Sequence, residues 1–277
     1  MKTTSQIKRE QDGTIELTIV VPWLGIKQTK DEVIADHAKE ADLAGFRKGM
    51  APLDLVEKSL DKGHIREDIL RKILPAAYAD AVKTNAINPI VSPRVRVQKI
   101  EDEKDWEIVA LTCEMPKIEL GNYKEEVEKV TAKSKILIPG KERETVSFDE
   151  ISKALLESVR LTVPKVILEQ ETERLLAQTL DEIKRLGLTL DQYLASTGKN
   201  IEALKADYAK KAESDIKIEF TLQQIASEQN IKVEESEIEE AIKAAKTDEE
   251  RKNLTNNKYL VASIIRQQKT LDFLRNL

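Results

Sequence analysis

Residues with distinctive chemistry are scarce in this chain of 277 residues, and their scarcity excludes several classes of protein. The single cysteine, Cys113, excludes an internal disulfide framework and suits a reducing compartment. The two histidines, His37 and His64, have no histidine or cysteine partner at a metal-binding spacing. We expect His37 to be a packed or capping residue, His64 to lie near a helix start, and Cys113 to be buried in a strand. No metal site is predicted.

Long apolar runs and glycine-rich loops are also missing. No run approaches the length of a membrane span, and residues 1–10 lack the apolar core of a signal peptide. No glycine-rich phosphate loop follows a strand, which argues against a nucleotide-dependent enzyme. The acidic run 234–240 is better explained as a solvated helix N-terminus than as a metal site. We therefore expect a cytoplasmic protein without membrane contact, cofactor or catalytic residues.

Charged residues are abundant, at 34% of the chain against 4% for aromatic residues. This profile is typical of long helices with solvent-exposed faces, and the length is sufficient for two domains. The net charge is −5, so the chain as a whole does not attract nucleic acid. Any contact with an anionic partner must therefore come from a local positive spot.

The first part of the chain, residues 1–116, contains both strand and helix signals. The turn Gln11-Asp12-Gly13, followed by alternating apolar residues, predicts a hairpin over 4–22. Pro75 predicts a bend or a break in the longest of the helices that follow. The later elements are predicted as helices over 29–43 (capped by Thr29), 52–60 and 65–85, and strands over 94–100 and 106–115. This order predicts an α+β domain, one antiparallel sheet covered by helices.

The segment Gly45-Phe46-Arg47-Lys48-Gly49-Met50-Ala51-Pro52 is the most informative part of the chain. Glycine adopts a positive φ without steric cost, so this segment can form a tight loop that exposes Phe46, Arg47 and Lys48. No acidic residue lies between Asp42 and Asp54 to neutralise the two cations locally. An exposed aromatic beside two cations favours a partner-binding site, and a surface loop without a partner is the alternative.

The segment and its flanks resemble the ribosome-docking signature of the trigger factor family of bacterial chaperones. The Asp12-Gly13 hairpin, the signature, Asn88-Pro89 and the exit segment 115–123 follow in the family's order. The resemblance implies docking on a ribosomal surface protein at the tunnel exit, with adjacent rRNA as a further candidate. The ribosome-binding residues that it implies are Gly45, Phe46, Arg47, Lys48 and Gly49.

Members of that family usually continue into a peptidyl-prolyl isomerase domain, for which this chain has no room. Recognition of proline needs a pocket walled by aromatic residues, whereas Phe148 is the only aromatic residue between Tyr123 and Ser152. Residues 117–146 are therefore interpreted as a linker in place of the isomerase domain, with a short strand over 136–138 as a candidate.

The remainder, residues 147–277, has helical periodicity throughout. Ser147 and Glu150 have the spacing of a capping box, and Asn200 is a candidate N-cap. The helices are expected from 147, from 164 to Gly187, and over 201–229, 234–245 and 248–274, with Gly187 and Gly198 as C-caps. The segments 162–164, 169–176, 189–194 and 225–238 also resemble the family's C-terminal chaperone domain, which implies a helical body with two arms.

Together these features predict an ATP-independent chaperone that docks at the ribosomal tunnel exit and holds nascent or unfolded polypeptides. Aliphatic residues of the arms are expected to bind these clients. The alternatives are a ribosome-independent holdase or assembly chaperone and a divergent peptidyl-prolyl isomerase. A homodimer formed through the arm is a further candidate.

Overall fold

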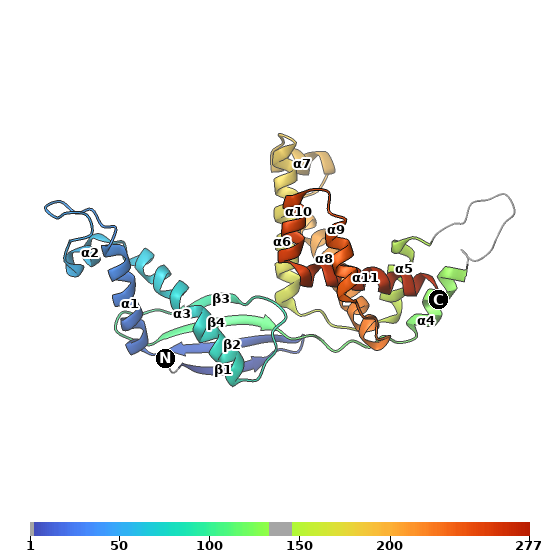
Figure 1. Ribbon diagram of the computed structural model, residues 1–277, viewed down its shortest axis with the longest axis horizontal. Helices are drawn as coiled ribbons and strands as arrows, with labels where there is room; N and C mark the ends of the chain where they lie inside the picture. The colour runs from blue at the N-terminus through green and yellow to red at the C-terminus, as the bar shows by residue number, and fades with distance from the viewer. Residues whose placement is uncertain (1–2, 133–145) are drawn as a thin grey trace. The chain divides into compact units, whose positions relative to one another are not determined.

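The computed structural model describes residues 3–132 and 146–277, and the chain divides into two compact units. Unit 1 comprises Met1–Met115 together with Pro164–Ile167. Unit 2 comprises Pro116–Val163 and Leu168–Leu277. Unit 1 combines a sheet with helices, whereas the described part of unit 2 is helical (Figure 1).

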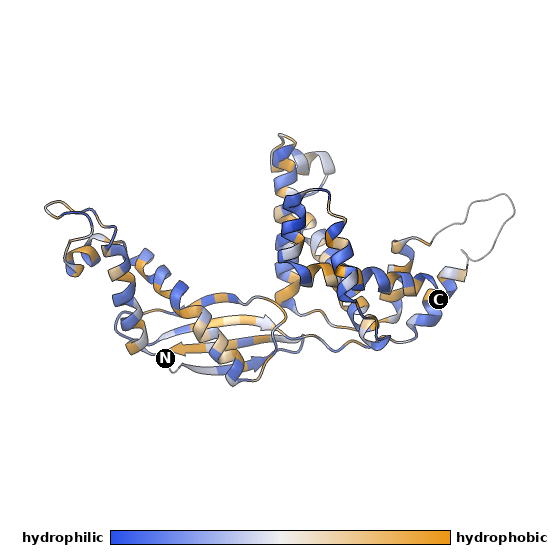
Figure 2. Ribbon diagram, in the orientation of Figure 1, coloured by the Kyte–Doolittle hydropathy of each residue, from blue (hydrophilic) through white to orange (hydrophobic). Residues whose placement is uncertain are grey.

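The sheet of unit 1 has four antiparallel strands in the order β1-β2-β4-β3. Their bounds are β1 (Thr4–Arg9), β2 (Thr14–Val21), β3 (Arg94–Lys99) and β4 (Trp106–Cys113). The central pair, β2 and β4, is in register over its whole length, with Leu17 opposite Ala110. These two strands are mostly apolar, whereas the edge strand β1 is mostly polar (Figure 2). The predicted hairpin, the two later strands and the α+β class are confirmed.

Helix α3 (Lys62–Thr84) lies across the sheet and supplies the core of unit 1 (Figure 1). Its buried residues recur every four positions and pack on the apolar face of β2; they are Ile65, Ile69, Ile73, Ala77 and Ala81. The predicted break at Pro75 is absent, because α3 continues through this residue. Pro75 is on the exposed side of the helix, where water can bind the carbonyl that the proline leaves without a donor.

Helix α1 (Trp23–Ala38) begins and ends earlier than predicted. The backbone N–H of Trp23 donates to Asp105, in the turn between β3 and β4, at 2.7 Å. Asp105 therefore supplies the acceptor for a backbone N–H at the start of α1. Thr29, the predicted cap, lies inside the helix and donates its hydroxyl to the carbonyl of Gly25. This start was missed because the residue that satisfies it is 82 positions away in sequence.

Eight further helices occur in the described residues after the sheet. Their bounds are α4 (Tyr123–Thr131), α5 (Phe148–Ser158), α6 (Lys165–Arg185), α7 (Leu190–Thr197), α8 (Ile201–Glu228), α9 (Glu235–Lys243), α10 (Asp248–Asn256) and α11 (Lys258–Arg275). The side chains of Ser147 and Glu150 form the predicted capping box at the start of α5. Asn200 accepts from the N–H of Ala203 and caps α8 as predicted.

Helices α4, α5, α8 and α11 enclose the core of unit 2. Their fully buried residues include Val127, Ile151, Leu155, Leu222, Ile225 and Leu274. Away from this core, α6 and α8 are joined by a hydrogen bond of 2.6 Å between the hydroxyls of Thr179 and Tyr208. Helix α7 lies at the end of these two helices (Figure 1). We call α7, the adjoining ends of α6 and α8 and the segments that connect them the arm.

Two parts of this region differ from the sequence-based expectation. Residues Tyr123–Thr131, in the segment interpreted as a linker, form α4, and its Val127 is fully buried in the core of unit 2. The candidate strand 136–138 lies outside the described residues. The single helix predicted over 248–274 is interrupted at Asn257, where φ is −120° and ψ is 40°. The amide of Asn257 donates to the carbonyl of Asn253, a local bond that competes with continuation of the helix.

Candidate functional site

The predicted binding segment forms the loop between α1 and α2 (Leu53–Ser59), at the outer tip of unit 1 (Figure 1). We call residues 39–52 the tip loop. It contains two successive turns, and each is closed by a backbone hydrogen bond across four residues. The N–H of Phe46 donates to the carbonyl of Leu43 at 3.0 Å, and the N–H of Met50 donates to that of Arg47 at 2.9 Å.

The two glycines occupy the same position in these two turns. Gly45 has a φ of 91° and Gly49 a φ of 79°, and each is the third residue of its turn. The residues before them, Ala44 and Lys48, do not have positive φ. This combination is the requirement of a type II turn, which favours glycine in third place. The four-residue spacing of the glycines therefore corresponds to two consecutive turns of one kind.

Gly49 has a second role that Gly45 lacks. Its N–H donates to the carbonyl of Ala41 at 3.0 Å and closes the loop at its base. A Cβ atom at position 49 would lie 2.8 Å from the carbonyl oxygen of Lys39, whereas a Cβ at position 45 would have nothing within 4 Å. The base of the loop therefore requires glycine for space as well as for conformation.

A small apolar cluster supports the loop from beneath. Ala38, Ala51 and Val56 are buried there, and Leu43 and Leu60 pack against them. Val56 is fully buried, although it belongs to a helix of only seven residues. Because both ends of the loop are anchored in this cluster, the intervening side chains are held at the surface.

The tip of the loop is exposed. The aromatic side chain of Phe46 retains 41% of its accessible surface, and both Arg47 and Lys48 are exposed. Within the described residues, neither cation has an ion pair or a side-chain hydrogen bond. The five predicted residues thus come together as one exposed, cationic and partly apolar tip.

Polar contacts fix α1, which carries the loop, against α3. The Nε2 atom of His37 lies 2.8 Å from the Oδ2 atom of Asp68, so this half-buried histidine joins two helices. The carboxylate of Asp36, in α1, accepts hydrogen bonds from the nearby Lys39 and from Lys72 of α3. Hydrogen bonds from Lys39 and then from Lys72 lower the pKa of Asp36 to about 2. These contacts hold α1 against α3.

The other residues considered for chemistry have structural environments. His64 lies in the first turn of α3, and its N–H donates to Asp61. Cys113 is fully buried, as predicted, and burial raises the pKa of its thiol to about 11. This thiol is therefore a poor nucleophile at neutral pH. In the parts of the chain that are described, no group of three or more metal-ligating side chains occurs.

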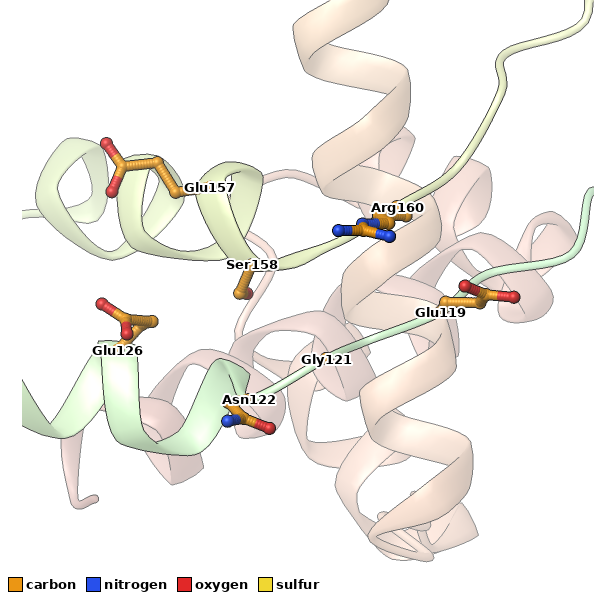
Figure 3. A pocket seen from close by; sticks show the side chains of 7 residues that line it. All are labelled: Glu119, Gly121, Asn122, Glu126, Glu157, Ser158 and Arg160. Carbon is orange, nitrogen blue, oxygen red and sulfur yellow. The ribbon is translucent and has the colours of Figure 1, made fainter.

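Unit 2 has a polar hollow of about 610 Å³ between two segments that pair through Glu119 and Arg160 (Figure 3). Glu119 is paired with Lys117 and Glu126 with Lys129, at 2.9 and 2.6 Å. The hydroxyl of Ser158 donates to the carbonyl of Leu155. The carboxylates of Glu119 and Glu126 are therefore paired with cations, and the Ser158 hydroxyl is bonded to a backbone carbonyl instead of to a base that could activate it.

Large apolar side chains are exposed on the arm and on α11 of unit 2. On the arm, Leu186 is 75% exposed, and Leu188 and Ile201 are 42% and 40% exposed. On α11, Tyr259 is 90% exposed and lies next to Leu260, at 57%. Sequence periodicity did not identify these residues as exposed, because an apolar residue gives the same periodic signal whether or not another part of the chain covers it. None of the helices described here is long and apolar enough to span a membrane.

Two family models match the chain. One, described as "Bacterial trigger factor protein (TF)", matches residues 1–137. The other, described as "Bacterial trigger factor protein (TF) C-terminus", matches residues 124–276. The two matches overlap over residues 124–137, so no stretch of the chain separates them.

Curated relatives with the name trigger factor align with a shorter stretch. The protein of Corynebacterium glutamicum (strain R) is 32% identical over 128 residues, which cover 46% of this chain and 28% of the relative. That of Staphylococcus epidermidis is 32% identical over 130 residues, covering 47% and 30%. That of Streptococcus mutans is 33% identical over 124 residues, covering 45% and 29%. The matched part of this chain thus spans less than a third of each relative's length.

A solved structure is similar over almost the whole chain. It is described as "Promiscuous Substrate Recognition in Folding and Assembly Activities of the Trigger Factor Chaperone". The TM-score is 0.63 at 14% identity, and the similarity covers 98% of this chain and 99% of that one. At this identity the similarity shows a shared fold, with the α+β part followed by the helical part.

Proposed function

Because the chain belongs to the trigger factor family, we propose that it is an ATP-independent chaperone that docks at the ribosomal tunnel exit and holds nascent polypeptides. The observation that carries this proposal is the tip loop. Two glycine turns expose one aromatic and two cationic side chains that have no partner within the described residues. A rigidly anchored loop of this kind loses little conformational entropy on docking.

The three exposed residues would have different roles. Phe46 would insert into an apolar pocket of a ribosomal surface protein, where a buried aromatic contributes most of the binding energy. Arg47 would form paired hydrogen bonds with a carboxylate or a phosphate, because its planar guanidinium matches these groups. Lys48 would add a looser, salt-sensitive charge contact. Gly45 and Gly49 would act through the conformation of the loop.

Client binding is assigned to unit 2. The exposed apolar side chains of the arm and of α11 provide separate apolar surfaces. Such surfaces bind extended apolar segments weakly and at several points, which suits a chaperone with many clients. The proposed division is a ribosome-binding part over 1–116, a connecting part over 117–146 and a chaperone part over 147–277. We further propose that the protein works in the cytoplasm and without isomerase activity.

Cosedimentation with bacterial ribosomes at moderate salt tests the docking proposal. Wild type is compared with the triple variant Phe46→Ala, Arg47→Ala, Lys48→Ala. Truncation of one central aromatic or arginine anchor typically costs about 2 kcal/mol or more, which is about thirtyfold in affinity. The variant removes two such anchors, Phe46 and Arg47, so its binding should weaken by a factor of at least about a hundred. A protease-free assay with a proline peptide should show no acceleration by wild type; turnover above background would contradict the absence of isomerase activity.

A control variant likewise removes one exposed apolar and two cationic side chains, from elsewhere in unit 1. Leu24, Lys27 and Lys83 are one exposed apolar residue and two exposed cations on α1 and α3. The triple variant Leu24→Ala, Lys27→Ala, Lys83→Ala should bind ribosomes like wild type. Equal loss in both triple variants would show nonspecific charge attraction. Failure of wild type to bind would refute the docking proposal itself.

A further inference from the structure

Among the large apolar side chains that follow Phe46 in the tip loop and α2, those of Met50 and Leu53 are the most exposed. Met50 retains 72% of its accessible surface and Leu53 retains 50%, against 41% for Phe46. A single exposed apolar residue is ordinary on a protein surface. Three of them within eight positions, beside two cations without partners in the described chain, concentrate exposed apolar surface of the kind that marks an interaction site.

The local backbone keeps this segment of the chain compact. The turn from Arg47 to Met50 places their Cα atoms within about 7 Å of each other, as in any β-turn. Leu53 follows three residues later, and three residues of chain span at most about 11 Å. Between them Ala51 is buried in the cluster beneath the loop, so the segment is anchored from its inner side.

We propose that Met50 and Leu53 extend the docking surface of Phe46, and that the whole surface fits an apolar depression with an acidic edge on a ribosomal protein. This inference rests on the proposed function. This apolar surface adjoins the proposed docking residues along the chain, and Arg47 and Lys48 supply the charge that complements an acidic edge. A protein is favoured over rRNA as the occupant because apolar side chains gain nothing against a phosphate backbone, whereas cations alone suffice there.

Met50 and Leu53 contribute to the affinity and specificity of docking and not to the shape of the loop. A serine at either position preserves the loop, because Met50 contributes its backbone N–H to the turn and Leu53 is exposed at the start of α2. Their apolar surface would be removed from water only when the partner is bound. The expected effect is therefore a faster dissociation rate with an almost unchanged salt dependence.

The test is equilibrium binding of the labelled full chain to purified ribosomes over a range of salt concentrations. The variant Met50→Ser, Leu53→Ser should bind at least about tenfold more weakly than wild type, with the same slope against salt. The control Leu24→Ser removes a side chain that is 80% exposed on α1 and should bind like wild type. Met50→Leu, Leu53→Met retains the apolar surface and should restore the affinity.

The outcomes separate this inference from the proposed function. If the double serine variant binds like wild type while the Phe46, Arg47, Lys48 triple variant does not, the inference is overturned and docking through the signature stands. If wild type does not bind ribosomes, the proposed function is refuted, and the inference that rests on it is refuted as well. Competition by free rRNA as strong as that by ribosomes overturns the assignment to a protein. A wild-type dimer in sedimentation velocity that the serine variant abolishes would instead assign this surface to a second copy.

Discussion

Two glycines four residues apart have unequal roles at the residue scale. Both Gly45→Ala and Gly49→Ala place alanine at a positive φ, which costs about 1–2 kcal/mol. Only at position 49 does the new Cβ collide with a backbone carbonyl, that of Lys39, which cannot rotate away. Gly49→Ala should therefore be the more destabilising of the two in urea unfolding followed by circular dichroism. It should also weaken ribosome binding more than Gly45→Ala; equal effects would show that φ alone matters.

A second residue-scale prediction concerns Asp36. Its pKa in the folded protein is about 2, below the ordinary value of 3.8, because Lys39 and Lys72 stabilise the charged form. A lowered pKa means that this contribution to stability is present above about pH 4 and is lost as the pH falls toward 2. Since the carboxylate is exposed, solvent screening keeps the contribution small.

A carboxyl NMR titration of the folded protein measures this pKa directly. The Asp36 resonance should shift with a midpoint near pH 2 in wild type. In Lys72→Met, which removes the contact from α3, the midpoint should move upward toward the ordinary range. An unchanged midpoint in this variant would mean that the contact between α1 and α3 is not formed in solution.

At the scale of the elements, α11 has one end in the core and one exposed face. Leu274 is fully buried among α4, α5 and α8, whereas Ile264, on the same helix, is 56% exposed. Leu274→Ala should reduce the free energy of unfolding by about 2–5 kcal/mol, because a cavity remains where the side chain was. Ile264→Ala should change it by less than about 0.5 kcal/mol. Denaturant unfolding of both variants, with similar m-values, tests whether α11 completes this core.

At the scale of the whole molecule, the proposed function places docking and client holding in different units. The Phe46, Arg47, Lys48 triple variant should therefore suppress the aggregation of a chemically denatured client as well as wild type does, in the absence of ribosomes. The variant Leu186→Ser, Tyr259→Ser should show the opposite pattern, with weaker suppression and intact ribosome binding. Light scattering during client refolding measures the first property and cosedimentation the second. Loss of both properties in either variant would contradict the division of labour.

Much of the fold was predictable because its signals are local. The alternation from Ile15 to Val21 and the four-residue spacing from Ile65 to Ala81 identified the central strand and the core helix. The capping box of Ser147 and Glu150 identified the start of α5. The α+β class and the position of the tip loop followed from the order of these elements. Each of these features depends on residues a few positions apart, so the sequence contains the whole of the interaction.

The sequence alone determined which side chains the tip loop contains, and the spacing of its glycines already indicated a tight, exposed loop. Only the tertiary structure decided which partner satisfies the start of α1, because Asp105 approaches Trp23 from a distant turn. It likewise decided that α4 joins the core and that Met50 and Leu53 remain uncovered. The physical reason is that burial is a property of neighbours in space: an apolar side chain in the sequence predicts a contact, and the packed chain decides whether that contact is made within the molecule or left for a partner.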